Sequence, residues 1–203
     1  MKRFSIVVCL CLCLLVLIGA GKTTKTRASK KEIFDAQYKL TSYYTFEYNA
    51  FDKEKKYHLD PSGKLISYWT YQYDQEGKRV KKVEYDSSEK IVSITTCDFD
   101  ANGKRTKKNV YDAQEKLQKY YVYEYDDNGK RKKRSKYTPK NEMKSYVLYS
   151  YNQKGKVEKK TTYSSDGEMI EWVLNEYDDE GKKLKKTVYD SKNIEKEYTM
   201  YHY

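Results

Sequence analysis

The sequence predicts an all-β fold, an antiparallel meander of tandem β-hairpins that forms an extended, twisted or curled repeat sheet. Three observations predict it: an aromatic residue recurs every 26 positions, a glycine recurs with the same step, and segments of strand length separate turn sequences. The aromatic column consists of Tyr73, Phe99, Tyr125, Tyr151, Tyr177 and Tyr203. The glycine column consists of Gly77, Gly103, Gly129, Gly155 and Gly181. Groups repeated at a fixed period are typical of an extended surface, not of one pocket.

Each 26-residue unit contains two turn sequences. The first reads Tyr-Asp-x-x-Gly-Lys, as at residues 125–130, and the second reads Tyr-Asp-x-x-x-Lys-Leu, as at residues 111–117. Asp hydrogen-bonds to the turn backbone, and Gly accepts the positive φ of a type I turn closed by a bulge. We therefore expect thirteen strands: seven long ones, ending at Tyr48 and at each residue of the aromatic column, and six short ones between them. The turn after Tyr48 is one residue shorter and should differ.

The N-terminal residues differ from the rest of the chain. Lys2 and Arg3 precede an apolar run from Phe4 to Ala20. This pattern predicts a secretory signal, with an uncleaved membrane anchor as the alternative, and hence a secreted, cell-surface or periplasmic protein. Three regions follow: a signal peptide at 1–21, a basic flexible leader at 22–33 and a tandem β-hairpin repeat domain at 34–203.

The composition favours a thin folded structure. The chain carries a formal net charge of +11 and 24 tyrosines, and a content of aromatic residues this high argues against disorder. Alternation along the long strands gives both faces apolar residues at mid-strand. The sheet therefore either curls, which we favour, or stays open with tyrosines stacked on both faces.

Positive charge recurs with the same period in three columns. The first is Lys78, Lys104, Lys130, Lys156 and Lys182; the second is Lys81, Lys107, Lys133, Lys159 and Lys185; the third is Lys82, Lys108, Arg134, Lys160 and Lys186. Alternation places the second and third columns on opposite faces. Such rows suit a long polyanion, and they equally suit a solvated face whose lysines prevent edge pairing and form cross-strand ion pairs.

One aromatic column is a candidate for stacking on a ligand. It consists of Tyr68, Tyr120, Tyr146, Trp172 and Tyr198. Exposed rings in a row stack on sugars or bases, whereas in a sheet with few aliphatic residues the same rings form the core.

The residues offer no catalytic or metal site. His58 and His202 have no nucleophile or ligand cluster at useful spacing, and Cys97 occupies a tyrosine column as a small apolar residue. Asp98 to Gly103 resembles the start of a calcium loop, but its twelfth position is Asn109, so turn chemistry explains it better. We expect no cofactor and no enzymatic activity.

Units such as Tyr-x-Tyr-Asp-x-x-Gly-Lys at 71–78 and 123–130 resemble YD repeats of the RHS type, found in bacterial secreted and surface proteins. The resemblance covers roughly residues 34–203, and Tyr-x-x-x-Gly-Lys is also similar to MORN-type hairpin repeats. It implies a coiling β-sheet that presents other domains, and carbohydrate binding. The second half-unit departs from the family's spacing, and Lys replaces much of its Arg and Gly.

The sequence thus predicts an exported, non-catalytic repeat protein whose Lys- and Tyr-rich surface binds an anionic polysaccharide or cell-envelope polymer. The alternative is a structural or protein-interaction module without a polyanion ligand. Nucleic acid is not an expected partner, and membrane contact is expected only through an uncleaved signal segment.

Overall fold

The computed structural model describes residues 29–34 and 38–201, and this part of the chain forms fourteen β-strands. They are β1 (Lys30–Phe34), β2 (Leu40–Tyr48), β3 (Lys53–Leu59), β4 (Leu65–Tyr73), β5 (Arg79–Asp86), β6 (Ile91–Phe99), β7 (Arg105–Tyr111), β8 (Leu117–Tyr125), β9 (Arg131–Tyr137), β10 (Met143–Tyr151), β11 (Val157–Ser164), β12 (Met169–Tyr177), β13 (Lys183–Asp190) and β14 (Glu195–Met200).

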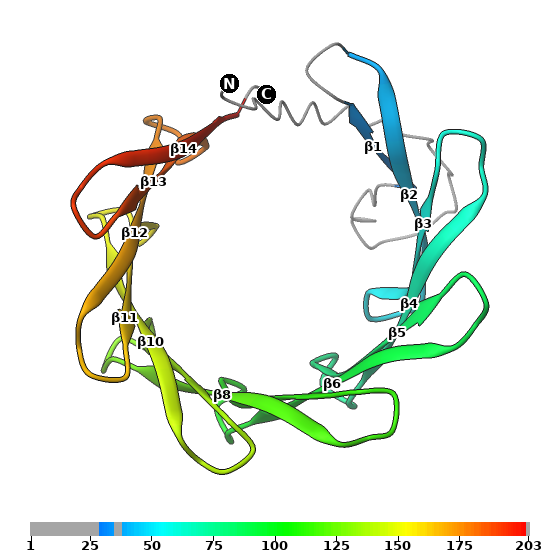
Figure 1. Ribbon diagram of the computed structural model, residues 1–203, viewed down its shortest axis with the longest axis horizontal. Coiled ribbons are helices and arrows are strands. Elements are labelled where there is room, and N and C mark those ends of the chain that lie inside the picture. Colours follow the sequence, from blue (N-terminus) through cyan, green and yellow to red (C-terminus); the bar gives the residue numbers. More distant parts are fainter. Residues whose placement is uncertain (1–28, 35–37, 202–203) are drawn as a thin grey trace, which may run out of the picture. The chain divides into compact units, whose positions relative to one another are not determined.

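The strands are hydrogen-bonded in chain order from β1 to β14, and neighbouring strands run antiparallel (Figure 1). This confirms the all-β meander of tandem hairpins. The chain divides into two compact units, residues 1–94 and 95–203. The described residues include no helix long and apolar enough to cross a membrane.

The first strand corrects the sequence-based expectation, which had thirteen strands and a flexible leader through residue 33. Lys31 and Glu32 of β1 pair with Tyr44 and Tyr43 of β2, and the Lys30 ammonium lies 2.7 Å from the Glu32 carboxylate. The lysines resemble a leader in sequence, but the edge of β2 supplies backbone partners that turn them into a strand. The predicted signal peptide and residues 22–28 of the predicted leader lie outside the described residues.

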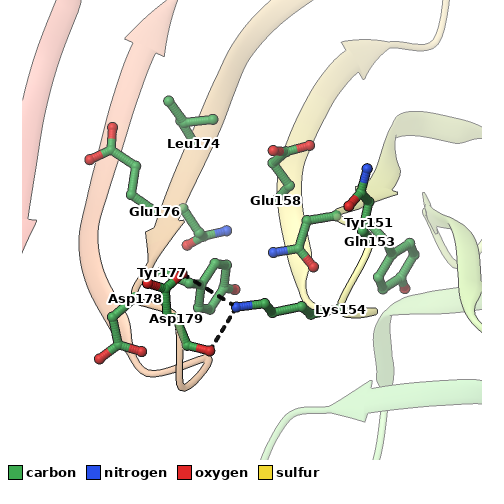
Figure 2. A pocket seen from close by; sticks show the side chains of 11 residues that line it. Tyr151, Gln153, Lys154, Glu158, Leu174, Glu176, Tyr177, Asp178 and Asp179 are labelled. Atoms are coloured by element: carbon green, nitrogen blue, oxygen red, sulfur yellow. Dashed lines mark hydrogen bonds and ion pairs between the residues drawn. The ribbon is translucent and has the colours of Figure 1, made fainter.

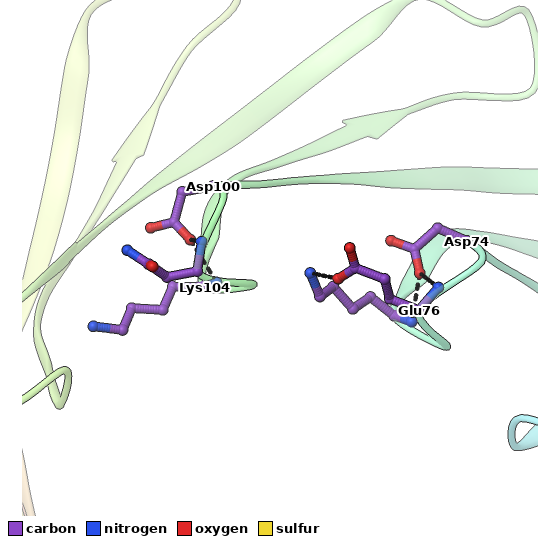
Figure 3. Close-up of polar contacts among 6 residues, drawn as sticks. Asp74, Glu76, Asp100 and Lys104 are labelled. Carbon is purple, nitrogen blue, oxygen red and sulfur yellow. Dashed lines mark hydrogen bonds and ion pairs between the residues drawn. The ribbon is translucent and has the colours of Figure 1, made fainter.

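Aspartate shapes the turns, as Figure 3 shows for two of them. Asp74 Oδ1 accepts hydrogen bonds from the backbone N–H groups of Glu76 and Lys78, at 3.0 and 2.8 Å. The Gly77 N–H donates to the Asp74 carbonyl, and Gly77 has a φ of 77°. These contacts confirm the predicted type I turn closed by a glycine in the left-handed region. The turn after Tyr48 is one residue shorter, as expected. The Asn49 N–H donates to the carbonyl oxygen of Asp52, three residues on, whereas the Asp74 N–H of the next such turn donates to that of Lys78, four residues on.

The second turn of the repeat adopts the same geometry, and in four repeats it does so without glycine. Glu89, Glu115, Asn141 and Asn193 have φ values between 58° and 65°. Gly63 and Gly167 occupy equivalent positions in other repeats. A side chain in the left-handed region costs on the order of 1 kcal/mol, so two glutamates store strain that glycine would release.

The aromatic column has a structural role that the period alone does not reveal. The hydroxyl of Tyr125 donates to the carbonyl oxygen of Arg105, at 2.8 Å, and Tyr151 bonds Arg131 in the same way. Tyr177 and Tyr73 donate to Val157 and Lys53 at 2.8 and 2.7 Å. Each bond joins the end of a long strand to the beginning of the preceding short strand, so the column ties neighbouring strands together.

Few side chains are fully buried, and they lie on both faces of the sheet. In the second unit Val147, Val188 and Tyr123 are buried on one face, whereas Tyr120 and Thr187 are buried on the other. This confirms that both faces are apolar at mid-strand. Each face has its own thin core, and the charged columns surround it.

Candidate functional site

Strand register sorts the candidate cations onto two faces. The paired face carries the second lysine column, Lys133 and Lys159 among them, and the cationic face carries the third column, with Arg134 and Lys160. Glu124 pairs with Lys133 and Tyr123 pairs with Arg134, so neighbouring residues of one strand point to opposite sides. The predicted separation of the two columns is confirmed.

On the paired face, some lysines have a glutamate opposite them, and their ammonium groups lie over aromatic rings. Glu124 lies opposite Lys133 with 3.7 Å between carboxylate and ammonium, and Glu176 lies opposite Lys185. The ammonium groups also lie over the candidate aromatic rings. The distances to the ring centroids are 4.5 Å for Lys107 and Tyr120, 4.9 Å for Lys133 and Tyr146, 4.3 Å for Lys159 and Trp172, and 5.1 Å for Lys185 and Tyr198.

The candidate aromatic column is packed against a second row of rings. The centroid distances are 4.5 Å for Tyr68 and Tyr85, 5.0 Å for Tyr120 and Tyr137, 5.0 Å for Tyr146 and Tyr163, and 4.0 Å for Trp172 and Tyr189. Tyr120 is 9% exposed and its hydroxyl donates to Asn141 Oδ1 at 2.9 Å. Tyr68, Tyr120, Tyr146 and Trp172 therefore serve the sheet as core, and most of their faces already have an aromatic or ammonium partner. Tyr198, the last member of the column, is 45% exposed.

The first lysine column lies at the turns. Lys78 and Lys182 form ion pairs with Glu76 and Glu180 of their own turns. Other members cover the glycine of the following turn: a Cβ atom built on Gly129 would lie 2.5 Å from Lys104 Nζ, and one built on Gly181 would lie 3.1 Å from Lys156 Cε. Lys130 lies near Gly155 in the same manner. This column connects successive turns and is the least suited of the three to a ligand.

On the cationic face, the third column lies between neutral neighbours. Arg134 pairs with Tyr123 and Val147 of the adjacent strands. Lys160 pairs with Tyr149 and Val173, and Lys186 with Asn175 and Thr199. Lys108 and Lys82 lie opposite Tyr121 and Tyr71. No carboxylate of the described chain forms an ion pair with Arg134 or Lys160. Lys82 and Lys186 of the same column do have carboxylates, those of Glu84 and Glu197, at 3.8 and 3.9 Å. Arg134 and Lys160 therefore lack the compensation that Glu124 gives Lys133.

Sequence reasoning missed a further row of cations on this face. Tyr125 pairs with Arg131 and Glu124 with Lys133, so Lys132 is a bulge residue and Arg131 shares a face with Arg134. The Arg131 guanidinium lies 4.7 Å from the Tyr123 ring centroid, and Lys183 lies 5.7 Å from that of Tyr201. Members of this row are Arg79, Arg105, Arg131 and Lys183, with Val157 in the position between the last two. The 26-residue period could have found the row, but strict alternation would have placed Arg131 on the wrong face.

The first unit contains another cation that lies over aromatic rings and that sequence reasoning missed. Lys56 lies 3.8 Å from the Tyr44 ring centroid and 4.4 Å from that of Trp69. Partial burial lowers its pKa, and the charges of Lys31 and Lys82 lower it further. His58 stacks on Tyr44 at 4.5 Å, and burial lowers its pKa, so it belongs to the packing of this unit.

Lys160 is a crowded cation of the second unit. Partial burial lowers the pKa of its ammonium group. Four neighbouring cations lower that pKa further: Lys183, Arg134, Lys186 and Arg131. Burial and the charge of Lys186 also lower the pKa of Lys183. These groups repel one another in a partly desolvated environment, a situation that a bound anion would relieve.

An open pocket of about 690 Å³ lies near the β10–β11 and β12–β13 turns (Figure 2). Lys154 spans it, and its ammonium lies 2.7 Å from the backbone oxygen of Asp179 and 3.7 Å from its carboxylate. Glu158, Glu176 and Asp178 also line the pocket. Its lining is acidic on balance, so it does not suit an anion. Within the described residues, no group of three His, Cys, Asp or Glu side chains could hold a metal ion.

Comparisons with known proteins support the fold. The family model described as "Protein of unknown function (DUF2963)" matches residues 137–189, from the end of β9 into β13. No curated protein matches the chain. A porin-like protein from Bacteroides uniformis ATCC 8492 is similar in structure, with a TM-score of 0.51 and 10% identity over 85% of this chain and 90% of that one. This likeness shows the all-β repeat fold and carries no function across.

Weaker similarities exist to two other solved structures. A protein with unknown function from Bacteroides fragilis NCTC 9343 has a TM-score of 0.34 and 16% identity over 66% of this chain and 91% of that chain. The Photorhabdus luminescens Tc holotoxin pore has a TM-score of 0.27 and 10% identity over 90% of this chain and 13% of that chain. Neither similarity is strong enough to support an inference about this protein.

Proposed function

We propose that this chain is an exported, non-catalytic repeat protein that binds an anionic glycan or cell-envelope polymer through its cationic face. The observation that carries the proposal is the contrast in cross-strand partners. Lys133 and Lys185 each lie opposite a glutamate on one neighbouring strand, whereas Arg134 and Lys160 lie opposite tyrosines and valines only. Lys159, opposite Ser150 and Leu174, is the exception among these paired-face lysines. A cation that lies between neutral residues gives the sheet no cross-strand ion pair, and this favours a role in binding an external anion.

The spacing of this column matches a chain-like ligand. Its members stand on every second strand, so successive cations are roughly 10 Å apart along the sheet. Because these cations are half-buried, physiological salt screens the repulsion between them only in part. A flexible polymer with closely spaced charges meets several of these cations at once and gains affinity from each. The YD-repeat resemblance and the predicted signal peptide are consistent with such a polymer lying outside the cytoplasm.

A matched pair of variants tests the proposal. One replaces Lys108, Arg134, Lys160 and Lys186 of the cationic face by Gln, and the other replaces Lys107, Lys133, Lys159 and Lys185 of the paired face by Gln. Both remove four positive charges from the same four strands, so total charge is controlled. The measurement is the affinity for heparin and for teichoic acid across a salt series.

We expect the cationic-face variant to lose most of its affinity and its salt dependence to weaken by roughly three units of slope, since each of the four cations releases about 0.7–0.9 counterions. The paired-face variant should stay within a few-fold of the wild type. Equal losses in the two variants, or no binding by the wild type at low salt, would overturn the proposal.

A protein-interaction module is the second candidate, and one surface favours it. β14 is the last strand in the sheet order, and Tyr198 and Met200 on it are 45% and 46% exposed. Exposed apolar residues on a terminal strand are suited to pairing with a strand of a partner protein. Binding of a protein partner that Met200→Lys abolishes, with no polyanion binding, would favour this candidate over the first.

A further inference from the structure

β1 and β14 are the first and last strands in the sheet order, and they are strands of different kinds. Among the described residues β1 pairs only with β2, and β14 pairs only with β13. β14 is the counterpart of the long strand β12, because Tyr198 follows Trp172 by 26 residues. The outer edge of such a strand presents backbone N–H and C=O groups with which another strand can pair.

β1 has the register and packing of a short strand of the repeat. Residues 30–34, Lys-Lys-Glu-Ile-Phe, match residues 185–189 of β13, Lys-Lys-Thr-Val-Tyr. In both strands the register against the following strand shifts before the last of these residues. The first lysine of each set lies over an aromatic ring of the following strand, 4.4 Å from the Tyr43 centroid for β1 and 5.1 Å from the Tyr198 centroid for β13. β1 is therefore a short strand that lacks, within the described residues, the preceding long strand that the others have.

Backbone hydrogen bonds show which groups point outward from these two strands. The Tyr201 N–H donates to a carbonyl oxygen of β13 at 3.0 Å. Because the backbone groups of successive strand residues point alternately to the two sides, those of Met200 point away from β13. The Phe46 N–H donates to the Ser29 carbonyl oxygen at 3.1 Å, so the backbone groups of Glu32 point away from β2 by the same alternation. Met200 and Glu32 therefore direct a donor and an acceptor to the outer edges of β14 and β1.

The junctions inside the sheet define how these two edges fit together. Leu174 of β12 lies opposite Thr187 of β13. Met200 is the counterpart of Leu174, and Glu32 is the counterpart of Thr187. In this register the outward backbone groups of Met200 and Glu32 face each other, as a hydrogen-bonded pair of an antiparallel ladder requires. The outer edge of β14 thus matches the outer edge of β1.

The charge of Glu32 narrows the choice of partner. Thr187 holds the same position in β13 and is 1% exposed. A carboxylate in this position disfavours indiscriminate pairing of the edge and needs a cation nearby. Lys30 supplies one at 2.7 Å, and Lys185 of a second copy would supply another on the same face, one strand beyond Met200. Charge and register therefore favour a second copy of this chain over an unrelated strand.

We propose that the outer edge of β14 binds β1 of a second copy as a further antiparallel strand pair, so that the meander continues from chain to chain. Each contact leaves one β1 and one β14 available, so copies add head-to-tail beyond the dimer unless the series closes into a ring. The inference names the partner of the strand that favours a protein-interaction module, and it does not depend on polymer binding.

Sedimentation velocity of the full chain measures the association over about a hundredfold range of concentration, because assembly obeys mass action. We expect dimers and longer species that dissociate on dilution. Met200→Glu places a second carboxylate opposite Glu32 and should weaken the association about tenfold or more. Adding Glu32→Lys to this variant should restore most of the association, because opposite charges then face each other.

A matched control carries the same change in an interior strand. Leu148 belongs to the same column on β10 and is 37% exposed. Because it lies away from both outer edges, Leu148→Glu should change the association by less than about twofold. Thermal melting of each variant separates a loss of association from a loss of fold.

Disulfide trapping tests the register. Thr199 and Ile33 are the counterparts of Val173 and Val188, which lie opposite each other. Thr199→Cys and Ile33→Cys are made as separate variants of a chain whose own four cysteines are replaced by alanine. Oxidation should link the two variants when they are mixed and should link neither variant alone. Thr199→Cys mixed with Glu32→Cys is the control and should give no link, because Ile33 and Glu32 point to opposite faces.

The outcomes decide for or against this assembly. Association that follows the charge exchange, with a crosslink in the expected pair only, supports it. A chain that stays monomeric at every concentration would overturn it and leave binding of a different protein to β14 untouched. Association that Met200→Glu does not weaken, or a Thr199→Cys variant that crosslinks to itself, would also overturn it. An internal crosslink in a monomeric chain that carries both cysteines would do the same, because β14 would then meet β1 of its own chain.

Discussion

Lys159 and Lys160 are neighbours on β11, yet they lie in opposite environments. Lys159 points to the paired face, opposite Ser150, with its ammonium 4.3 Å from the Trp172 ring centroid. Lys160 points to the cationic face, where it is half-buried and four other cations lower its pKa. Both lysines lie opposite neutral residues, Lys159 between Ser150 and Leu174 and Lys160 between Tyr149 and Val173, so what separates them is the charge around Lys160. Residue type alone therefore does not identify a binding surface in this repeat; the surrounding charges have to be known as well.

The largest expected effect concerns the core of the paired face. Tyr120→Ala should destabilise the second unit by about 3 kcal/mol, because it removes a buried ring, its stacking on Tyr137 and its hydrogen bond to Asn141. Urea unfolding measures the change. Tyr120→Phe keeps the ring and should cost only about 1 kcal/mol. A loss below 1 kcal/mol for the alanine variant would mean that the candidate aromatic rings are not core and are open to a ligand.

The tyrosine hydroxyls that join neighbouring strands give the next effect. Tyr151→Phe should cost about 1 kcal/mol, because the Arg131 carbonyl loses its donor at 2.8 Å. Tyr163→Phe is the control on the paired face, because that hydroxyl has no hydrogen-bond partner among the described residues. Chemical denaturation of both variants should show a difference. Equal stabilities would remove the structural explanation of the 26-residue aromatic column.

Relief of turn strain should stabilise the protein without touching either face. Glu115 has a φ of 58°, so Glu115→Gly should gain about 0.5–1 kcal/mol. Glu115→Gln removes the same charge and keeps the strain, so it should gain nothing. Thermal melting measures both variants, and heparin affinity should be equal in the two. A gain in both would assign the effect to charge instead of to backbone conformation.

The smallest effect is the one that contrasts the two faces most directly. In the absence of ligand, Lys160→Gln should stabilise the protein by about 0.5 kcal/mol, whereas Lys159→Gln should be neutral or slightly destabilising. Since folding lowers the pKa of Lys160, the unfolded chain holds this proton more tightly, and the charged lysine opposes folding at neutral pH.

The pH dependence follows from that sign. As the pH rises through the lowered pKa of Lys160, the wild type should lose this penalty and approach the stability of Lys160→Gln. Melting temperatures of the two proteins from neutral to alkaline pH measure the convergence. A constant gap, or a destabilised Lys160→Gln variant, would contradict the crowding of cations on this face.

Much of the architecture could be predicted from the sequence. Asp-x-x-Gly turns and strand-length Tyr-rich segments have local causes, so the hairpins, their antiparallel order and the opposite faces of Lys81 and Lys82 are confirmed. β1 could not be foreseen, because its lysines become a strand only when β2 offers an edge. Positive φ at Glu89 and Glu115 was hidden for a similar reason: the repeat imposes the turn on whatever residue stands there.

The sequence by itself determined the period, the turns and the identity of the cations, because these follow from short-range chemistry repeated along the chain. Only the tertiary structure decided which cations share a face and what lies opposite them. The bulge at Lys132 brings Arg131 to the side of Arg134, and the sheet register places Lys160 between Tyr149 and Val173. Register and bulges arise from pairing between strands, so the charge environment that defines the candidate site exists only once the strands have paired.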